Sequence, residues 1–111
     1  MVTMADIDLD TMRASAARTC SMLKTLSNPD RLLLLCQISQ GERCVSDLEG
    51  ALDIHQPTLS QQLGVLRDEG LVDTRRDGKF IYYSVASKEA LAVMQVLYEQ
   101  FCKAKPKRVK R

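Results

Sequence analysis

Hydrophobic positions at helical spacing mark the first quarter of the chain. Between Asp8 and the SNPDR segment they fall at Met12, Ala16, Cys20, Leu23 and Leu26, with no Pro or Gly among them. This spacing predicts an amphipathic helix over 8–26. The SNPDR segment then predicts a stop and a restart, because Asn28 can cap a helix and Pro29 suits its first position.

The second predicted helix runs from Pro29 to about Ser39 and ends before Gly41. Its LLLL run places apolar side chains on nearly every side of the helix, a pattern typical of a central, buried element. Cys36 directly follows this run, and a thiol there is expected either to be an inert part of the core or to have a partner elsewhere.

Two shorter helices are predicted next. The SDLE segment has the spacing of a capping box, with Ser46 and Glu49 able to satisfy each other's backbone donors, and it predicts a helix through about Leu52. The HQPTLSQQLGVLRDEG segment predicts a fourth helix that has Pro57 in its first turn and ends at Gly70. The inward face of this helix is formed by Leu59, Leu63 and Leu66.

The pattern changes to alternation after the fourth helix. LVDTRR and FIYYSV predict two strands, and Asp77-Gly78 between them is a strong hairpin signal. Ser87 can then cap a fifth helix over 88–102. The order helix, helix, helix, helix, hairpin, helix predicts a mainly α fold with a β-hairpin wing, that is, a winged helix-turn-helix.

The outward face of the fourth helix is the candidate DNA-reading surface. Its side chains are mostly short, neutral hydrogen-bonding groups that can approach bases and phosphates in a major groove. A solvated face is the alternative, although such faces usually carry Glu and Lys pairs. The candidate residues are Gln56, Thr58, Ser60, Gln61, Gln62 and Arg67.

Basic residues flank the predicted hairpin turn. Arg75, Arg76 and Lys79 can contact phosphates or the minor groove, although charge at a hairpin tip alone is a weak signal. The only histidine, His55, falls where the N-cap of the fourth helix is expected, and we predict a capping or phosphate contact for it. A metal site needs partners of matching geometry, so we predict neither a metal nor a cofactor.

Charge and composition refine this picture. The last nine residues carry a charge of +6. Since the net charge of the chain is +2, residues 1–102 together carry −4. We therefore predict one domain for DNA binding and dimerisation over 1–102 and a basic, disordered tail over 103–111. The chain has neither a long apolar run nor a secretory signal, so we expect a cytoplasmic protein without a membrane partner.

Motifs along positions 22–102 resemble the ArsR family of small bacterial repressors. They are LKTLSNPDRLLLL, QPTLSQQLGVLRDEGLV and RRDGKFIYYSV. The resemblance implies a homodimer built from the first and last helices, with recognition helices in successive major grooves of palindromic operator double-stranded DNA. His55 departs from the serine more usual in the family, which leaves the local cap open.

The cysteines bear on the signal that releases DNA. Cys44 matches one thiolate of the arsenic-sensing members, but Ser46 and Glu49 stand where further cysteines would be, and residues 88–102 lack the His of zinc and nickel sensors. Cys36 and Cys102 resemble the sulfide-responsive branch, the biofilm growth-associated repressors. That branch implies that persulfide or polysulfide, the reactive sulfur inducer, bridges the two sensor thiols and relieves repression.

Other interpretations of the thiols remain open. Cys36 and Cys102 can be two structural cysteines, and the repressor can respond to arsenite or to general redox change through Cys44, which we expect to be exposed. Cys20 is interpreted as packing on the dimer-forming helix. A fold that kept its shape but lost DNA binding is a third alternative. An enzyme is not expected, because a cysteine nucleophile needs a base and His55 belongs to the DNA-reading unit.

Overall fold

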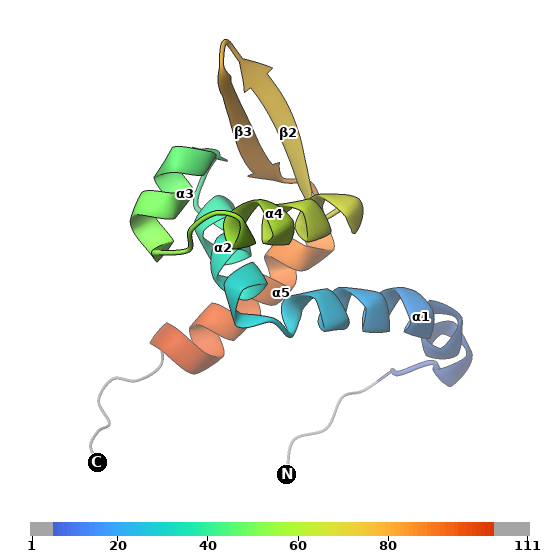
Figure 1. Ribbon diagram of the computed structural model, residues 1–111. Helices are drawn as coiled ribbons and strands as arrows, with labels where there is room; N and C mark the ends of the chain where they lie inside the picture. Colours follow the sequence, from blue (N-terminus) through green and yellow to red (C-terminus); the bar gives the residue numbers. More distant parts are fainter. Residues whose placement is uncertain (1–5, 104–111) are drawn as a thin grey trace, which may run out of the picture.

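The computed structural model describes residues 6–103, and the predicted mainly α fold with a hairpin wing is confirmed (Figure 1). The helices are α1 (Leu9–Leu26), α2 (Pro29–Ser39), α3 (Val45–Leu52), α4 (Thr58–Asp68) and α5 (Lys88–Tyr98), and α5 continues as a π-helix over Glu99–Lys103. The strands are β1 (Arg43–Cys44), β2 (Val72–Asp77) and β3 (Phe80–Val85). The predicted tail over 103–111 lies outside the described residues apart from Lys103.

Side-chain caps begin three of the helices. The Asp8 carboxylate accepts from the backbone N–H of Asp10 at the start of α1. Two of the predicted caps are confirmed, since Asn28 Oδ1 accepts from the N–H of Arg31 at 3.1 Å and Ser87 Oγ accepts from that of Ala90 at 3.0 Å. Each cap satisfies a backbone donor that has no partner inside the helix.

The predicted capping box of α3 is wrong by two residues. The N-cap is Cys44 rather than Ser46, and the Asp47 carboxylate accepts from the backbone N–H of Cys44 at 3.2 Å. The shift arises because β1, a two-residue strand that pairs with β3, ends at Cys44 and fixes where the helix begins. A strand this short leaves no alternating pattern in the sequence, so it was not predicted.

Three antiparallel strands form the sheet, in the order β1-β3-β2. Val72 pairs with Val85 at the base of the hairpin and Asp77 pairs with Phe80 at its tip. The two turn residues are therefore Gly78 and Lys79, one position later than the predicted Asp77-Gly78. Gly78 has φ +64, a left-handed conformation that glycine adopts without a steric penalty.

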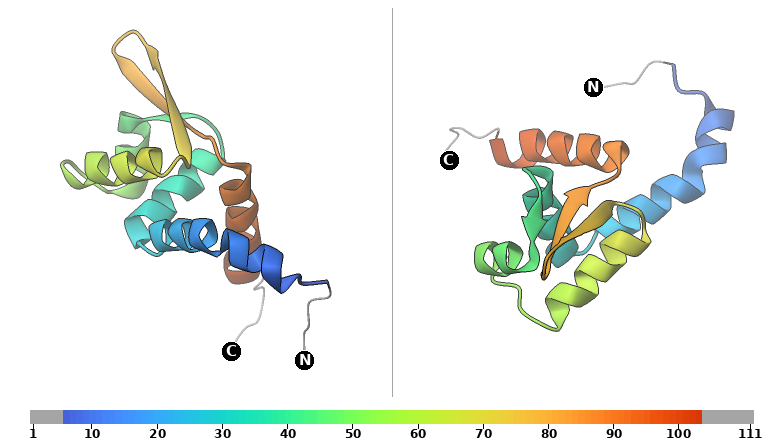
Figure 2. Two further views of the ribbon diagram at one scale, coloured as in Figure 1. Left: turned by 90° about the vertical axis from the view of Figure 1, so that its right-hand side faces the viewer. Right: turned by 90° about the horizontal axis from the view of Figure 1, so that it is seen from above.

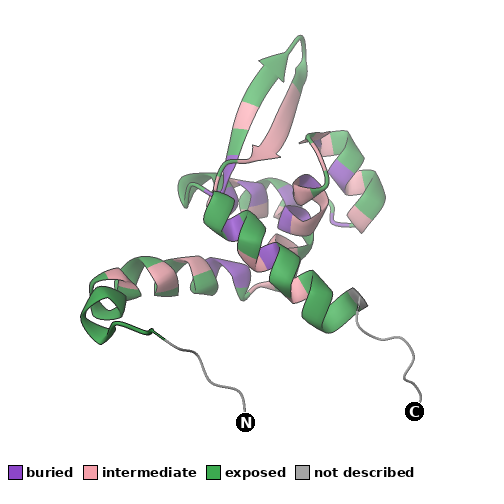
Figure 3. Ribbon diagram, turned by 180° about the vertical axis from the view of Figure 1, so that it is seen from behind, coloured by how far each residue is buried: buried purple, intermediate pink, exposed green. Residues whose placement is uncertain are grey.

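The core surrounds α2, as the LLLL run predicts. Leu34, Leu35 and Ile38 are buried, and the inward leucines of α4 pack in the same cluster. Leu33 departs from the prediction, because it is 47% exposed. In Figure 3 the buried residues gather where α2, α4 and α5 meet, while α1 and the outer part of α5 are mostly exposed.

The two ends of the described chain extend away from this core. Figure 2 shows α1 and α5 leaving the body of the molecule in different directions, and neither is covered along its outer length. Within residues 6–103, no helix is both long and apolar enough to cross a membrane.

Candidate nucleic-acid interface and cysteine environments

The helix α4 exposes a polar face on the side away from the core. Leu59, Leu63 and Leu66 are buried, and this inward packing fixes which side chains point outward. The residues predicted to read DNA differ in how far their side chains are exposed. Gln56, Ser60, Gln61 and Arg67 are exposed, whereas Thr58 and Gln62 are half-buried.

Two of the predicted reading residues are engaged within the protein. Gln56 Oε1 accepts from the backbone N–H of Ser60 at 3.0 Å and so caps the first turn of α4. Gln62 Oε1 accepts from Nη1 of Arg31 at 2.9 Å. Gln61 and Arg67, in contrast, make no side-chain hydrogen bond to any residue within 6–103, so their polar groups are available to a ligand.

His55 is hydrogen-bonded to residues of α3 and of the turn that follows it, and it does not cap α4. Its Nε2 lies 2.6 Å from Oδ1 of Asp53, and its Nδ1 lies 3.2 Å from Oε2 of Glu49. The hydrogen bond with Glu49, followed in size of effect by that with Asp53, raises the pKa of His55 above its ordinary value of 6.5. The predicted cap is therefore wrong, because two carboxylates, from α3 and from the turn, hold the ring, while the alternative of a phosphate contact stays a prediction. His55 precedes the cis Gln56–Pro57 bond.

Arg75 anchors the hairpin to the segment before β1. Its Nε and Nη2 each donate to a carboxylate oxygen of Glu42 at 2.7 Å, and the guanidinium lies 4.6 Å from the ring centre of Tyr82. The hydrogen bond from Arg75 lowers the pKa of Glu42. Arg76 and Lys79 are exposed and have no ion pair with another described residue, so they are the available cations of the hairpin.

Cys44 is buried, 7% exposed, and the expectation of an exposed thiol is wrong. Its Sγ lies 3.2 Å from Ser46 Oγ and donates to Asp47 Oδ2 at 3.2 Å. The backbone and side-chain hydrogen bonds from Cys44 lower the pKa of Asp47. The thiol is therefore buried at the point where β1 pairs with β3, and no signal in the local sequence indicates this burial.

The other three cysteines occupy more open positions. Cys36 is half-buried and lines a hollow of about 350 Å³ between α2 and α5, whose α5 wall includes Leu91, Met94 and Tyr98. Cys102 is exposed in the π-helix that extends α5, and Cys20 is exposed on α1. All four thiols are free, and no group of three or more His, Cys, Asp or Glu within 6–103 is arranged to hold a metal.

Comparison with known proteins identifies the family. Residues 28–74 match the family described as "Bacterial regulatory protein, arsR family". The chain is 50% identical over 97 residues to the biofilm growth-associated repressor of Agrobacterium fabrum, covering 87% of this chain and 83% of the relative.

Solved structures agree with this assignment. The crystal structure of the transcriptional repressor BigR from Xylella fastidiosa is 45% identical with a TM-score of 0.83, over 86% of this chain and 98% of that one. A homodimeric winged helix-turn-helix DNA-binding domain from Mycobacterium bovis is 29% identical with a TM-score of 0.68, over 96% of this chain and 100% of that one. The chain belongs to the arsR family of bacterial regulatory proteins and, like these relatives, is a transcriptional regulator rather than an enzyme.

Proposed function

We propose that the chain is a homodimeric repressor that binds palindromic operator DNA and releases it when a persulfide or polysulfide bridges Cys36 and Cys102. One observation carries the proposal. Cys36 opens into a hollow against α5, the helix whose π-helical extension bears Cys102. Cys102 follows Tyr98, a residue that lines this hollow, by about one helical turn.

Exposed apolar side chains on α1 and α5 support the homodimer. A chain of this size rarely leaves so many large apolar groups uncovered on two helices unless they meet a partner. The M. bovis domain that shares the fold is a homodimer. The exposed residues are Leu9, Met12 and Leu23 on α1, Leu91, Val96 and Tyr98 on α5, and Phe101 beyond it.

The α4 face and the hairpin support binding to duplex DNA. A major groove admits one helix, and Ser60, Gln61 and Arg67 project from the exposed side of α4. Arg76 and Lys79 extend the polar surface to the hairpin, where cations contact phosphates. A two-fold dimer presents two α4 helices, which fit half-sites about 34 Å apart.

The proposed switch follows thiol exchange chemistry and balances in two steps. The Cys36 thiolate attacks the outer sulfur of a persulfide RSSH, which breaks the sulfur–sulfur bond, releases RS⁻ and leaves Cys36 as a persulfide. The Cys102 thiolate then attacks the inner sulfur of this persulfide, forms the disulfide and releases HS⁻. A donor that transfers two sulfurs leaves a longer chain on Cys36, and attack on its middle sulfur gives a trisulfide bridge.

A bridge between these thiols would join α2 to the end of α5. Since α5 carries much of the proposed dimer surface, the bridge would change how the two subunits meet and therefore the spacing of the two α4 helices. A coupling of about 3 kcal/mol lowers DNA affinity over a hundredfold. The geometric demand is modest, because a disulfide needs Cα atoms within roughly 7 Å and each added sulfur widens that reach.

The test uses the purified chain and a duplex that it selects from a random-sequence library. We expect a palindromic duplex, and an affinity loss of about a hundredfold after treatment with glutathione persulfide, reversed by dithiothreitol. Peptide mass spectrometry should find residues 36 and 102 joined, with a mass two hydrogens below the reduced pair or heavier by whole sulfur atoms. Fully bridged protein that still binds the duplex with unchanged affinity would contradict the switch.

Matched reagents separate the alternatives. Arsenite and hydrogen peroxide in parallel reactions test an arsenite or general redox response through Cys44, which the burial of that thiol disfavours. Release by arsenite but not by persulfide would replace the proposed inducer. If no duplex is selected at all, the chain retains the fold without DNA binding.

A further inference from the structure

Arg31 joins α1, α2 and α4 through one side chain. From the first turn of α2, its Nε donates to the carbonyl oxygen of Thr25 at 2.7 Å, and its Nη1 donates to Gln62 Oε1 at 2.9 Å. Its Nη2 also reaches the carbonyl oxygen of Lys24 at 3.5 Å. Thr25 and Lys24 lie in the last turn of α1, where carbonyl groups lack partners inside the helix and a cation complements the dipole. Arg31 therefore holds the end of α1 against the middle of α4.

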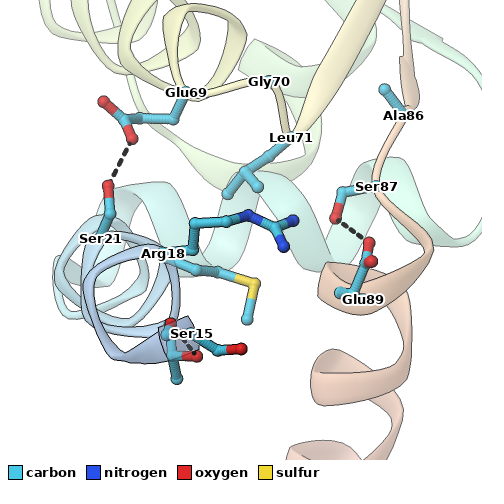
Figure 4. A pocket seen from close by; sticks show the side chains of 11 residues that line it. Ser15, Arg18, Ser21, Glu69, Gly70, Leu71, Ala86, Ser87 and Glu89 are labelled. Carbon is cyan, nitrogen blue, oxygen red and sulfur yellow. Dashed lines mark hydrogen bonds between the residues drawn. The ribbon is translucent and has the colours of Figure 1, made fainter. Parts of the chain in front are cut away.

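A second polar contact ties α1 to the far end of α4. Ser21 Oγ donates to Oε1 of Glu69, the C-cap of α4, at 2.9 Å. Figure 4 shows this bond at the edge of a hollow of about 570 Å³ between α1, the end of α4 and the start of α5. Gln62 and Glu69 are about 10 Å apart along the helix axis. The buried leucines of α4 hold it in the core, and two polar contacts at this separation further restrain its direction relative to α1.

The helix at the other side of these contacts is α1, one of the two helices with uncovered apolar residues. Leu9, Met12 and Leu23 are exposed on it. Its segment 21–25 is tied to α4 directly through Ser21 and indirectly through Arg31 of α2. One helix therefore has both an unpartnered apolar surface and two polar links to the DNA-reading helix.

We infer that Arg31 and Ser21 are positioning residues that set the direction of α4 relative to the dimer interface, and that Gln62 serves DNA binding through Arg31 rather than by reading a base. The inference rests on the proposed dimeric DNA binding. One α4 can enter one major groove with or without the two ties. Two α4 helices must match half-sites about 34 Å apart, so the ties matter when both half-sites are occupied.

The experiment compares binding to the full palindromic duplex and to a duplex carrying one half-site, both taken from wild-type selection. Arg31→Gln should lower affinity for the full palindrome about tenfold and for the half-site less than about twofold. Ser21→Ala should also lower the ratio of full-palindrome affinity to half-site affinity, by a smaller factor. Inserting one base pair between the half-sites should penalise the wild type more than Arg31→Gln, because the variant tolerates a wrong spacing.

Three further variants separate positioning from folding and from charge. Lys24→Gln removes a neighbouring cation but keeps the backbone carbonyl that Arg31 contacts. The ratio of full-palindrome affinity to half-site affinity should therefore stay at its wild-type value. Arg31→Lys keeps the charge without the planar fork and should resemble Arg31→Gln. Gln62→Met should match Arg31→Gln, and the double variant should be no worse than either single change. Equal melting temperatures would establish that these effects do not come from unfolding.

Several results would overturn the inference. Equal losses on full and half-site duplexes would assign Arg31 to general stability. Additive losses in the double variant, with a loss on the half-site for Gln62→Met, would return Gln62 to direct readout. A wild type that selects no palindrome would remove the proposed function and this inference together. Normal selection with an unchanged ratio in Arg31→Gln would remove the inference alone.

Discussion

Two halves of the molecule differ in the side chains that they expose. The first half consists of α3, α4 and the hairpin, and the second consists of the two helices α1 and α5. In the first half, several polar side chains find partners within residues 6–103, although the exposed residues of α4 and the two free cations of the hairpin do not. Arg75 is paired with Glu42, His55 lies between two carboxylates, and the Cys44 thiol donates to Asp47. In the second half, large apolar side chains stay exposed, up to 78% for Phe101.

The same division separates the thiols. Cys44, in the first half, is buried and hydrogen-bonded, while Cys36 of α2 borders a hollow against α5 and Cys102 lies at the solvent-exposed end of the α5 extension. A thiolate reacts only where a reagent can reach it, so the difference in access separates a structural cysteine from candidate sensors. The half proposed to contact DNA presents a polar surface, whereas the half proposed to assemble and to sense leaves large apolar side chains uncovered.

Adding charge to α5 is expected to have the largest effect. Val96 is 56% exposed, and in a two-fold interface Val96→Glu would introduce two uncompensated carboxylates. The variant should be monomeric by light scattering and should bind the palindrome about a hundredfold more weakly or worse, since two half-sites are no longer held together. Ala51→Glu, which adds the same charge to the exposed surface of α3, should stay dimeric. A dimeric Val96→Glu would place the interface elsewhere.

Removing one of the two proposed sensor thiols tests the proposed persulfide response directly. Cys36→Ser and Cys102→Ser should each bind DNA like the wild type and lose the roughly hundredfold response to glutathione persulfide, measured by gel shift. Cys44→Ser is the control and should still respond, because the Cys44 thiol is buried and hydrogen-bonded to Asp47. If Cys36→Ser responded while Cys44→Ser did not, the sensor would belong to the start of α3.

The α4 face should give a smaller, sequence-dependent effect. Gln61→Ala removes an exposed amide and should weaken binding to the selected duplex by about 1–3 kcal/mol relative to random duplex, in a competition assay. Ser46→Ala, at an exposed position on α3, serves as the control. Equal losses on selected and random duplexes would count against base readout.

At the hairpin, the expected effect is smaller again and independent of sequence. Arg76→Ala should weaken all duplexes alike and flatten the salt dependence by about one phosphate contact, a slope change near 0.9. The control is Asp73→Asn, which removes an exposed charge of opposite sign on the same strand. An unchanged salt slope in Arg76→Ala would exclude Arg76 from the phosphate contacts.

The smallest effect concerns pH and the turn before α4. The folded-state pKa of His55 is raised, so its stabilising contribution is full below about pH 6.5 and is lost as pH rises through the higher folded value. His55→Gln should therefore lower the melting temperature more at pH 6 than at pH 8.5. A difference that is the same at both pH values would show that the charged form of the ring does not contribute.

The helices and the hairpin could be predicted because each depends on residues close in sequence. The apolar period predicts α1 and α5, the SNPDR segment predicts the start of α2, and the caps at Asn28 and Ser87 are local hydrogen bonds. The predicted start of α3 was wrong because β1 pairs with β3 and ends at Cys44. The predicted cap at His55 was wrong because Glu49 and Asp53, six and two residues before it, bind its ring instead.

The candidate site divides in the same way. The polar face of α4 follows from the buried leucines on its opposite side, so its exposed members were predictable from helical spacing. The engagement of Gln62 by Arg31 and of Arg75 by Glu42 joins residues more than 30 positions apart, and no local pattern encodes it.

By itself, the sequence determined the order of the five helices and the hairpin, the inward leucines of α4 and the polar side of α4, because backbone periodicity and local caps depend on neighbouring residues. Only the tertiary structure decided which cations remain available, which thiol is covered and which apolar faces lack a partner. These properties depend on packing between distant segments, where the free energy of a contact is set by position in space rather than by separation along the chain.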